Sequence, residues 1–405
     1  MTEKKQRLAN VELLRSLAMI MVVIMHFLTH SDSLIELDQS LSSTRIIGML
    51  LENFCLAAVN VYVFISGFYG IKSTFKPSRV LTLICQIWFY ALLIPLALTV
   101  VNNIPAIAQA TGGIPTAAGT QGVYGLIQYI FPIETEHYWF ATSYFMLYLL
   151  TPILNKAANG LTQKQFKIIL AGLLILFCGI KSISPVVFAF DKYGYDLPWF
   201  ICVYLVAAYL RKFGSRFFEK KSWLVYAGSA LAGFGIGLLM WFLAAKSDNF
   251  AYYFTVPYHY NFILCLTGAI GLFYGFSKIN IKEGKTAQFL RRLGTLSFGV
   301  YLLHEHIDIR YLWYGWLKNL INPTAQSSMA YFLLELIFCV IVVFTAGITI
   351  DWIRSLLFKS VAKVLKNTMI GRGMQKLDRT FRIQDTVNGE DTAIDESIDK
   401  GEGEV

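Results

Sequence analysis

Long apolar stretches recur along the 405-residue chain, separated by short polar segments. A helix that crosses a bilayer needs about 20 mainly apolar residues, and most of these stretches reach that length. We predict ten membrane-spanning helices, at residues 8–28, 47–70, 80–101, 138–154, 166–183, 195–210, 222–245, 256–276, 294–317 and 329–353. The sixth is short and the ninth is unusually polar. The pattern predicts an all-α, polytopic integral membrane bundle.

The segments between these helices are alternately richer and poorer in lysine and arginine. Because cytoplasmic loops carry the excess of these residues, the alternation predicts that both chain ends are cytoplasmic. The longest outside segment, 102–137, contains neither lysine nor arginine. We expect residues 1–358 to form the membrane domain. Residues 359–405 are expected to form a cytoplasmic tail that is first basic and then acidic and disordered.

Composition agrees with this class of protein. The chain is 56% hydrophobic and only 15% charged, whereas a soluble domain carries about 25% charged residues. The net charge of +9 is spread over many short loops, so a nucleic-acid partner is not expected. The six cysteines all fall in apolar runs without a CxxC pair, and we predict no metal site.

Two ionisable residues in the first predicted helix need an explanation. Arg15 and His26 are eleven positions apart, which places them on one helix face about 16.5 Å apart along the axis. Ionisable groups inside a membrane are costly and usually face the bundle interior or a wet cavity. Arg15 alone could extend to the cytoplasmic headgroups. Its phase relation to His26 favours a shared site instead, and the topology places all six histidines toward the outer side.

Four motifs together point to a known family. They are the Arg-x10-His pair, VYVFISGF, EHYWF and LSFGVYLLH, which contain Arg15, His26, Ser66, His137, Trp139, Tyr301 and His304. In this order, and among ten predicted spans, they resemble the membrane-bound acyltransferase-3 family over roughly residues 8–353. Many members have leucine where this chain has Tyr138.

The resemblance implies an acyltransferase of the cell membrane that acylates, most often acetylates, a hydroxyl of a surface glycan or lipid-linked sugar. The donor substrate would be cytoplasmic acyl-CoA, most simply acetyl-CoA, without a permanently bound cofactor. Arg15 would hold this donor, and His26 would act as the general base.

The resemblance leaves several roles open. His304 is the second catalytic candidate, because His304 or Glu305 could orient His26, or His304 could itself be the base. Trp139, Tyr301 and His304 are candidate donors to an oxyanion. Ser66, His137, Trp139 and Tyr301 are assigned as supporting or acceptor-binding residues. Direct transfer, an acyl-enzyme relay and the oligomeric state also stay open.

The segment before His137 suggests the kind of acceptor. Because it has no positive charge, it is not expected to attract an acidic acceptor. Aromatic residues within this segment and directly after it favour stacking on a neutral sugar ring, and the alternative is that they are interfacial anchors; they are Tyr124, Tyr129, Tyr138 and Trp139.

Two other classes of protein fit the sequence less well. A secondary transporter would show similar intramembrane charges, but usually with two related halves, and no internal repeat is visible. A glycan-binding scaffold without catalysis is the third reading. Alanine at His26 separates it from an enzyme, because a scaffold would tolerate the change.

Overall fold

A computed structural model describes residues 7–106, 109, 113–184, 191–324 and 326–387. Helices and their connecting loops make up all of these residues, without a strand among them. The prediction of an all-α bundle is therefore confirmed. The main helices are α1 (Ala9–His30), α2 (Ser43–Cys55), α3 (Ala57–Gly70), α4 (Pro77–Asn102), α8 (Trp139–Gly160), α9 (Gln163–Leu174), α11 (Leu197–Phe213), α12 (Arg216–Ala244), α14 (Ile263–Ser277), α15 (Lys285–His304), α17 (Met329–Leu365) and α18 (Met369–Val387).

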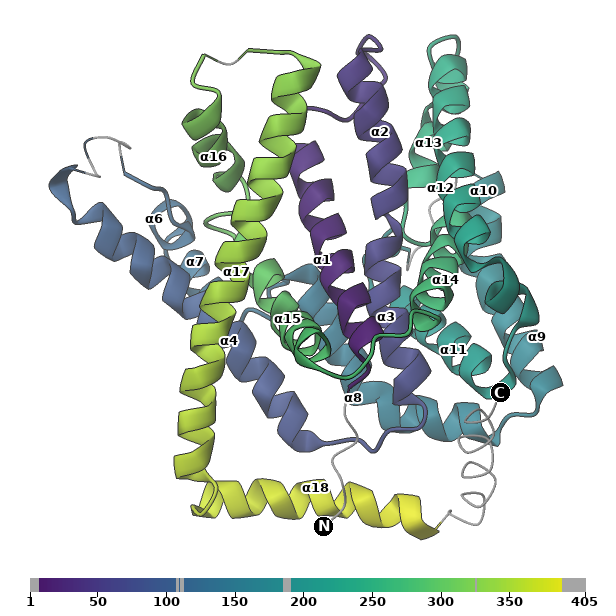
Figure 1. Ribbon diagram of the computed structural model, residues 1–405, viewed down its shortest axis with the longest axis vertical. Coiled ribbons are helices and arrows are strands. Elements are labelled where there is room, and N and C mark those ends of the chain that lie inside the picture. The colour runs from purple at the N-terminus through teal and green to yellow at the C-terminus, as the bar shows by residue number, and fades with distance from the viewer. Residues whose placement is uncertain (1–6, 107–108, 110–112, 185–190, 325, 388–405) are drawn as a thin grey trace.

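Shorter helices and helical turns lie between the main helices. They are α6 (Ala117–Gln121), α7 (Val123–Ile130), α10 (Lys181–Ile183), α13 (Ala251–Thr255) and α16 (Trp313–Ile321), the π-helical turn η1 (Ile175–Ile180), and the 3-10 turns η2 (Asp248–Phe250) and η3 (Val256–Tyr258). The helices α6 and α7 lie at the left edge of the molecule in Figure 1, at about mid-height and well above α18.

Seven helical segments are long and apolar enough to cross a membrane. They are Ala9–His30, Ser43–Gly70, Pro77–Asn102, Gln163–Ile183, Arg216–Ala244, Asp248–Ser277 and Met329–Leu365. Each overlaps one predicted span, and the protein is a multi-pass membrane protein. The other three predicted spans overlap the helices α8, α11 and α15. These helices do not have both the length and the apolar composition that a membrane-spanning helix needs. The count of ten spans thus stays a prediction.

The ninth predicted span, 294–317, is wrong as a single helix. The helix α15 ends at His304, and α16 begins only at Trp313. The chain leaves the helix where two acidic side chains find partners elsewhere in the fold. Glu305 lies beside His26 of α1, and Asp308 accepts hydrogen bonds from Tyr129 and from the backbone of Ala117. Buried charges require such partners, so the polarity of this segment is the reason for the break.

The basic part of the predicted tail is helical. The helix α17 continues past the expected boundary at 358, and α18 lies across one end of the bundle (Figure 1). The Asp378 carboxylate accepts hydrogen bonds from the backbone N–H (2.9 Å) and hydroxyl (2.7 Å) of Ser78, in the first turn of α4. A carboxylate is favourable at a helix N-terminus. The disorder expected for the acidic part past about residue 383 stays a prediction, because that part, apart from the last residues of α18, lies outside the described residues.

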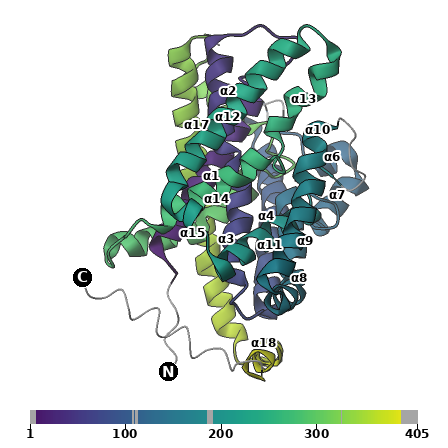
Figure 2. The same ribbon diagram turned by 90° about the vertical axis from the view of Figure 1, so that its right-hand side faces the viewer.

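The helix α1 is the centre of the bundle. It packs against α2, α3, α14, α15 and α17, and both views show it enclosed by them (Figures 1 and 2). Its side chains are largely buried, as are those of α3. In Figure 1, α1 runs upward and α17 runs downward, so α1 begins and α17 ends on the same side. The ionisable residues of α1 are consequently buried or half-buried; they are Glu12, Arg15, His26 and His30.

A glycine allows α15 to approach α1 closely. A Cβ atom at Gly294 would lie 2.5 Å from the carbonyl oxygen of Glu12 and 2.7 Å from its Cβ atom. From this contact α15 runs along α1 until His304 reaches His26. The absence of a side chain at Gly294 thus sets the distance between the two helices that carry the polar residues.

Gly294→Ala should lower the unfolding temperature of the detergent-purified protein, because overpacking a tight contact costs about 1–3 kcal/mol. Gly235→Ala is the matched control, since a Cβ atom there has open space within 4 Å, and alanine favours a helix by up to about 1 kcal/mol. Scanning calorimetry of both variants measures the difference. Equal unfolding temperatures for wild type and Gly294→Ala would show that this contact does not limit the helix packing.

Candidate active site

A cavity of about 250 Å³ opens beside the first half of α1, where three arginines line it: Arg7, Arg15 and Arg79. Ser66 and Tyr144, from α3 and α8, form part of its wall. Guanidinium groups are suited to phosphate oxygens, because they are always charged and present several donors in one plane. The cavity can therefore hold a multiply charged anion.

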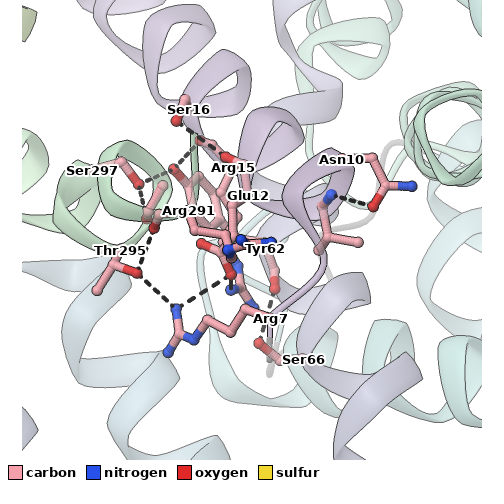
Figure 3. A network of polar contacts seen from close by, with 12 residues as sticks. Arg7, Asn10, Glu12, Arg15, Ser16, Tyr62, Ser66, Arg291, Thr295 and Ser297 are labelled. Carbon is pink, nitrogen blue, oxygen red and sulfur yellow. Dashed lines mark hydrogen bonds and ion pairs between the residues drawn. The ribbon is translucent and has the colours of Figure 1, made fainter. Parts of the chain in front are cut away.

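A buried carboxylate positions two of these arginines. Glu12 is 1% exposed and forms ion pairs with Arg15, one turn further along α1, and with Arg7 (3.3 Å). The Tyr62 hydroxyl donates to the backbone carbonyl of Arg15 (2.6 Å), and these groups gather between α1, α3 and α15 (Figure 3). Arg15 thus faces a protein cavity, so the simple headgroup interpretation of this residue is not supported.

A second, smaller cavity of about 20 Å³ lies further along α1 and includes His26. Its wall is mainly aromatic and contains Tyr62, Trp139, Phe140, Tyr260, Phe298 and Tyr301. Tyr62 and Phe140 pack edge to face, and Phe140 stacks on Tyr144 of the arginine cavity. Three aromatic rings therefore separate the arginine cavity from the His26 cavity.

His26 and His304 form a directed hydrogen-bond pair. His304 Nδ1 lies 2.6 Å from the Val300 carbonyl oxygen; since a carbonyl only accepts, this nitrogen carries the proton. His304 Nε2 is then the acceptor, and His26 Nδ1 donates to it across 2.8 Å. Neutral His26 is thereby left with its lone pair on Nε2. His26 is half-buried and lines the cavity, whereas His304 is 1% exposed.

This tautomer distinguishes the two histidines. His26 has a free basic nitrogen and access to the cavity, while both nitrogens of His304 are occupied. Glu305 Oε1 lies 3.2 Å from His26 Nδ1, where a carboxylate stabilises the imidazolium that forms when His26 takes up a proton. The arrangement fits His26 as the base and His304 as the group that orients it.

The same three side chains are also a possible metal-ligand set, because their ligand atoms lie within 4.8 Å of one another. Two imidazole nitrogens bound to one tetrahedral zinc ion would be about 3.3 Å apart. The 2.8 Å separation of the His26 and His304 nitrogens is instead typical of a hydrogen bond. The geometry thus favours the hydrogen-bonded pair.

The remaining candidates occupy different places. Trp139 and Tyr301 line the His26 cavity, and the Tyr301 hydroxyl accepts from the Phe140 N–H (3.3 Å), which leaves its own proton free to donate. Ser66 lies in the arginine cavity and shares a hydrogen bond with Tyr144. His137 is buried with both ring nitrogens occupied, by the Gln128 carbonyl and the Ile307 N–H. It therefore fastens α7 to the segment that follows α15.

A third cavity, of about 370 Å³, lies between the α6–α7 segment and residues 307–312. The sequence interpretation of this region is partly wrong. Tyr129 and Tyr138 are buried, with their hydroxyls bonded to Asp308 and to the Leu302 carbonyl. Neither ring is available to stack on a sugar. Tyr124 is exposed, and Trp139 belongs to the His26 cavity.

Comparison with protein-family models gives one match, to the acyltransferase domain, over residues 8–350. The chain belongs to the membrane acyltransferase-3 family. No curated protein and no solved structure that was compared with this acyltransferase matched it. The matched region includes α1, α15 and all the residues that line the three cavities except Arg7, so the cavities are features of the acyltransferase domain.

Sequence reasoning missed several residues of the acyltransferase site. Glu12 was recognised as polar, but its role was not, although its i,i+3 spacing to Arg15 is the usual signal for a helical ion pair. Arg7 and Arg79 lie in segments whose basic residues were used only to predict the orientation of the protein in the membrane. The place of Arg79 in the cavity depends on the tertiary packing of α4 against α8, which carries no local sequence signal.

The His26–His304 pair predicts unequal effects of substitution. His26→Ala should reduce turnover by roughly 10²-fold or more, as expected for loss of a general base. His304→Gln keeps an acceptor for His26 Nδ1–H and should retain more turnover than His304→Leu. The Michaelis constant for the acyl donor should stay unchanged in all three variants, because Arg15 is distant.

Steady-state kinetics of the purified protein checks these values. His30→Ala is the matched control, since this half-buried histidine of the same helix lies outside the pair. If His304→Gln were as inactive as His26→Ala, His304 rather than His26 would be the better candidate for the base.

Proposed function

We propose that the protein transfers an acyl group, most simply acetyl, from cytoplasmic acyl-CoA to a hydroxyl of an extracytoplasmic glycan at the cell membrane. The observation that supports this most is the position of two unlike cavities along one helix. A cationic cavity surrounds Arg15, and an aromatic cavity surrounds the free nitrogen of His26. A donor with a charged head and a distant reactive thioester would occupy both.

The arginine cavity would hold the phosphates of the donor. Arg7, Arg15 and Arg79 supply the positive charge, and Glu12 keeps two of them in place. The pantetheine arm would then extend along α1 over the roughly 16.5 Å that separate Arg15 from His26. To do so it would pass between the rings of Tyr62, Phe140 and Tyr144. The nucleotide would thus stay on the cytoplasmic side while only the thioester reaches His26.

The chemistry at His26 would be a direct acyl transfer. His26 Nε2 takes the proton of the acceptor hydroxyl while the hydroxyl oxygen attacks the thioester carbonyl carbon. The tetrahedral intermediate collapses by breaking the carbon–sulfur bond. The departing CoA thiolate takes the proton from the His26 imidazolium, which gives the ester, free CoA and neutral His26. Glu305 and His304 would stabilise and orient the ring throughout the cycle.

The developing oxyanion would be met by neutral donors. The Tyr301 hydroxyl is polarised by the Phe140 N–H that donates to it. The Trp139 indole N–H makes no hydrogen bond within the described residues and faces the same cavity. Preorganised donors in a water-poor site are effective at stabilising such charge. Ser66, by contrast, lies with the donor head, and this position favours direct transfer over a Ser66 acyl-enzyme.

Deletion of the gene, followed by mass spectrometry of the cell-surface glycans, tests the proposal. We expect loss of the mass of an acetyl group from one glycan class, restored by the wild-type gene but not by His26→Ala produced at equal membrane abundance. Loss of a heavier group would identify another acyl donor. Unchanged glycans in the deletion strain would contradict transfer to a glycan.

A further inference from the structure

The third cavity contains a cation that makes no contact ion pair with a carboxylate of the described residues. Arg310 lines it, and one guanidinium nitrogen, Nη2, donates to the His137 carbonyl (2.7 Å). No carboxylate of the described residues forms an ion pair with Arg310, and its Nε is buried without a hydrogen-bond partner. A guanidinium remains charged at any physiological pH. Its charge is thus available to a ligand.

The nearby acid attracts Arg310 but forms no contact ion pair with it. Asp308 also lines the cavity, but its carboxylate accepts hydrogen bonds from the Ala117 N–H (2.7 Å) and from the Tyr129 hydroxyl (2.8 and 3.0 Å). These bonds fix the α6–α7 segment against residues 307–312. Asp308 is 5% exposed, so it builds the wall of the cavity and Arg310 supplies its charge.

A second unsatisfied group lies in the same wall. The side-chain oxygen Oε1 of Gln128 is buried without a donor in the described part of the chain. Leaving a buried acceptor unpaired is unfavourable. The cavity therefore presents one group that requires an anion and another that requires an O–H or N–H donor.

The cavity is also placed next to the His26 site. Arg310 holds the carbonyl of His137, and Trp139, two positions further on, lines the His26 cavity. On the other side, residues 305–310 connect Arg310 to Glu305, which contacts His26. Two short stretches of chain, 137–139 and 305–310, therefore connect this cavity to the His26 site.

We propose that this cavity binds the acceptor through an anionic group, with Arg310 holding a carboxylate or phosphate and Gln128 accepting a hydrogen bond from an adjacent hydroxyl. The acceptor is thus an acidic glycan rather than the neutral sugar that the uncharged 102–137 segment suggested. The charge comes from the segment after α15, which folds against that loop. This inference rests on the proposed acyl transfer to a glycan.

The test uses the native acceptor without knowing its identity. Envelope glycans are extracted from cells that carry only His26→Ala, so that they lack the acyl group and remain acceptors. Purified full-length protein is assayed with these glycans and radiolabelled acetyl-CoA. Arg310→Gln should raise the Michaelis constant for the glycan about tenfold, the equivalent of about 1.4 kcal/mol, and leave that for acetyl-CoA unchanged. The Michaelis constant of Arg310→Lys for the glycan should lie between those of wild type and Arg310→Gln.

Arg45→Gln is the matched control, because Arg45 also has a buried, unpartnered Nε but lies outside this cavity. Its kinetics should equal those of wild type. Two treatments of the glycan identify the anion: reduction of carboxyl groups, or release of phosphates with hydrogen fluoride. The treatment that removes the recognised anion should reduce wild type to the level of Arg310→Gln, without a further effect on that variant.

Three results would overturn the inference. They are an unchanged glycan Michaelis constant in Arg310→Gln, an equal change in Arg45→Gln, or full activity of wild type on glycan that has undergone both treatments. Failure of the proposed function looks different, because wild type would then label none of the extracts. In that case the proposed acyl transfer to a glycan would be contradicted, and the assignment of the third cavity to an acceptor would be contradicted with it.

Discussion

The contact between α1 and α15 is the constraint on which both halves of the site depend. At one end, Gly294 of α15 lies against the backbone of Glu12, beside the ion pairs that hold Arg7 and Arg15. At the other end, His304 accepts a hydrogen bond from His26. One helix pair thus determines the position of the anion-binding arginines and of the basic nitrogen. Because protein interiors are close-packed, a change in this spacing would be felt at both ends.

This arrangement also explains how a membrane interior tolerates so many ionisable groups. Glu12 is paired with two arginines, and His304 is held between His26 and the Val300 carbonyl. Isolated charges in a low-dielectric environment would be costly, whereas paired and hydrogen-bonded groups are tolerated. Arg310 differs, because no carboxylate of the described residues forms a contact ion pair with it. That difference separates the groups that build the site from the one that remains available to a ligand.

The sequence predicted those features of the fold and site that follow from a regular spacing of residues along one segment. Runs of apolar residues predicted the bundle, and the eleven-residue spacing predicted that Arg15 and His26 share a face. The break after His304 was not predicted, because hydropathy does not show that Glu305 and Asp308 have partners on other helices. The same limit explains why a neutral acceptor was expected. Arg310 joins the wall built by residues 115–128 only after α15 has packed against α1.

The central claim is that donor and acceptor reach His26 from opposite sides of the membrane. The donor would enter through the arginine cavity, and the acceptor would bind in the third cavity, at Arg310. The most direct measurement is acyl transfer in proteoliposomes of known protein orientation. Radiolabelled acyl-CoA and acceptor glycan are each added to only one side of the membrane, in every combination of sides. Product should form when acyl-CoA contacts the side of α18 and the glycan contacts the opposite side, and in no other arrangement. Equal transfer with both substrates on the same side would contradict the account.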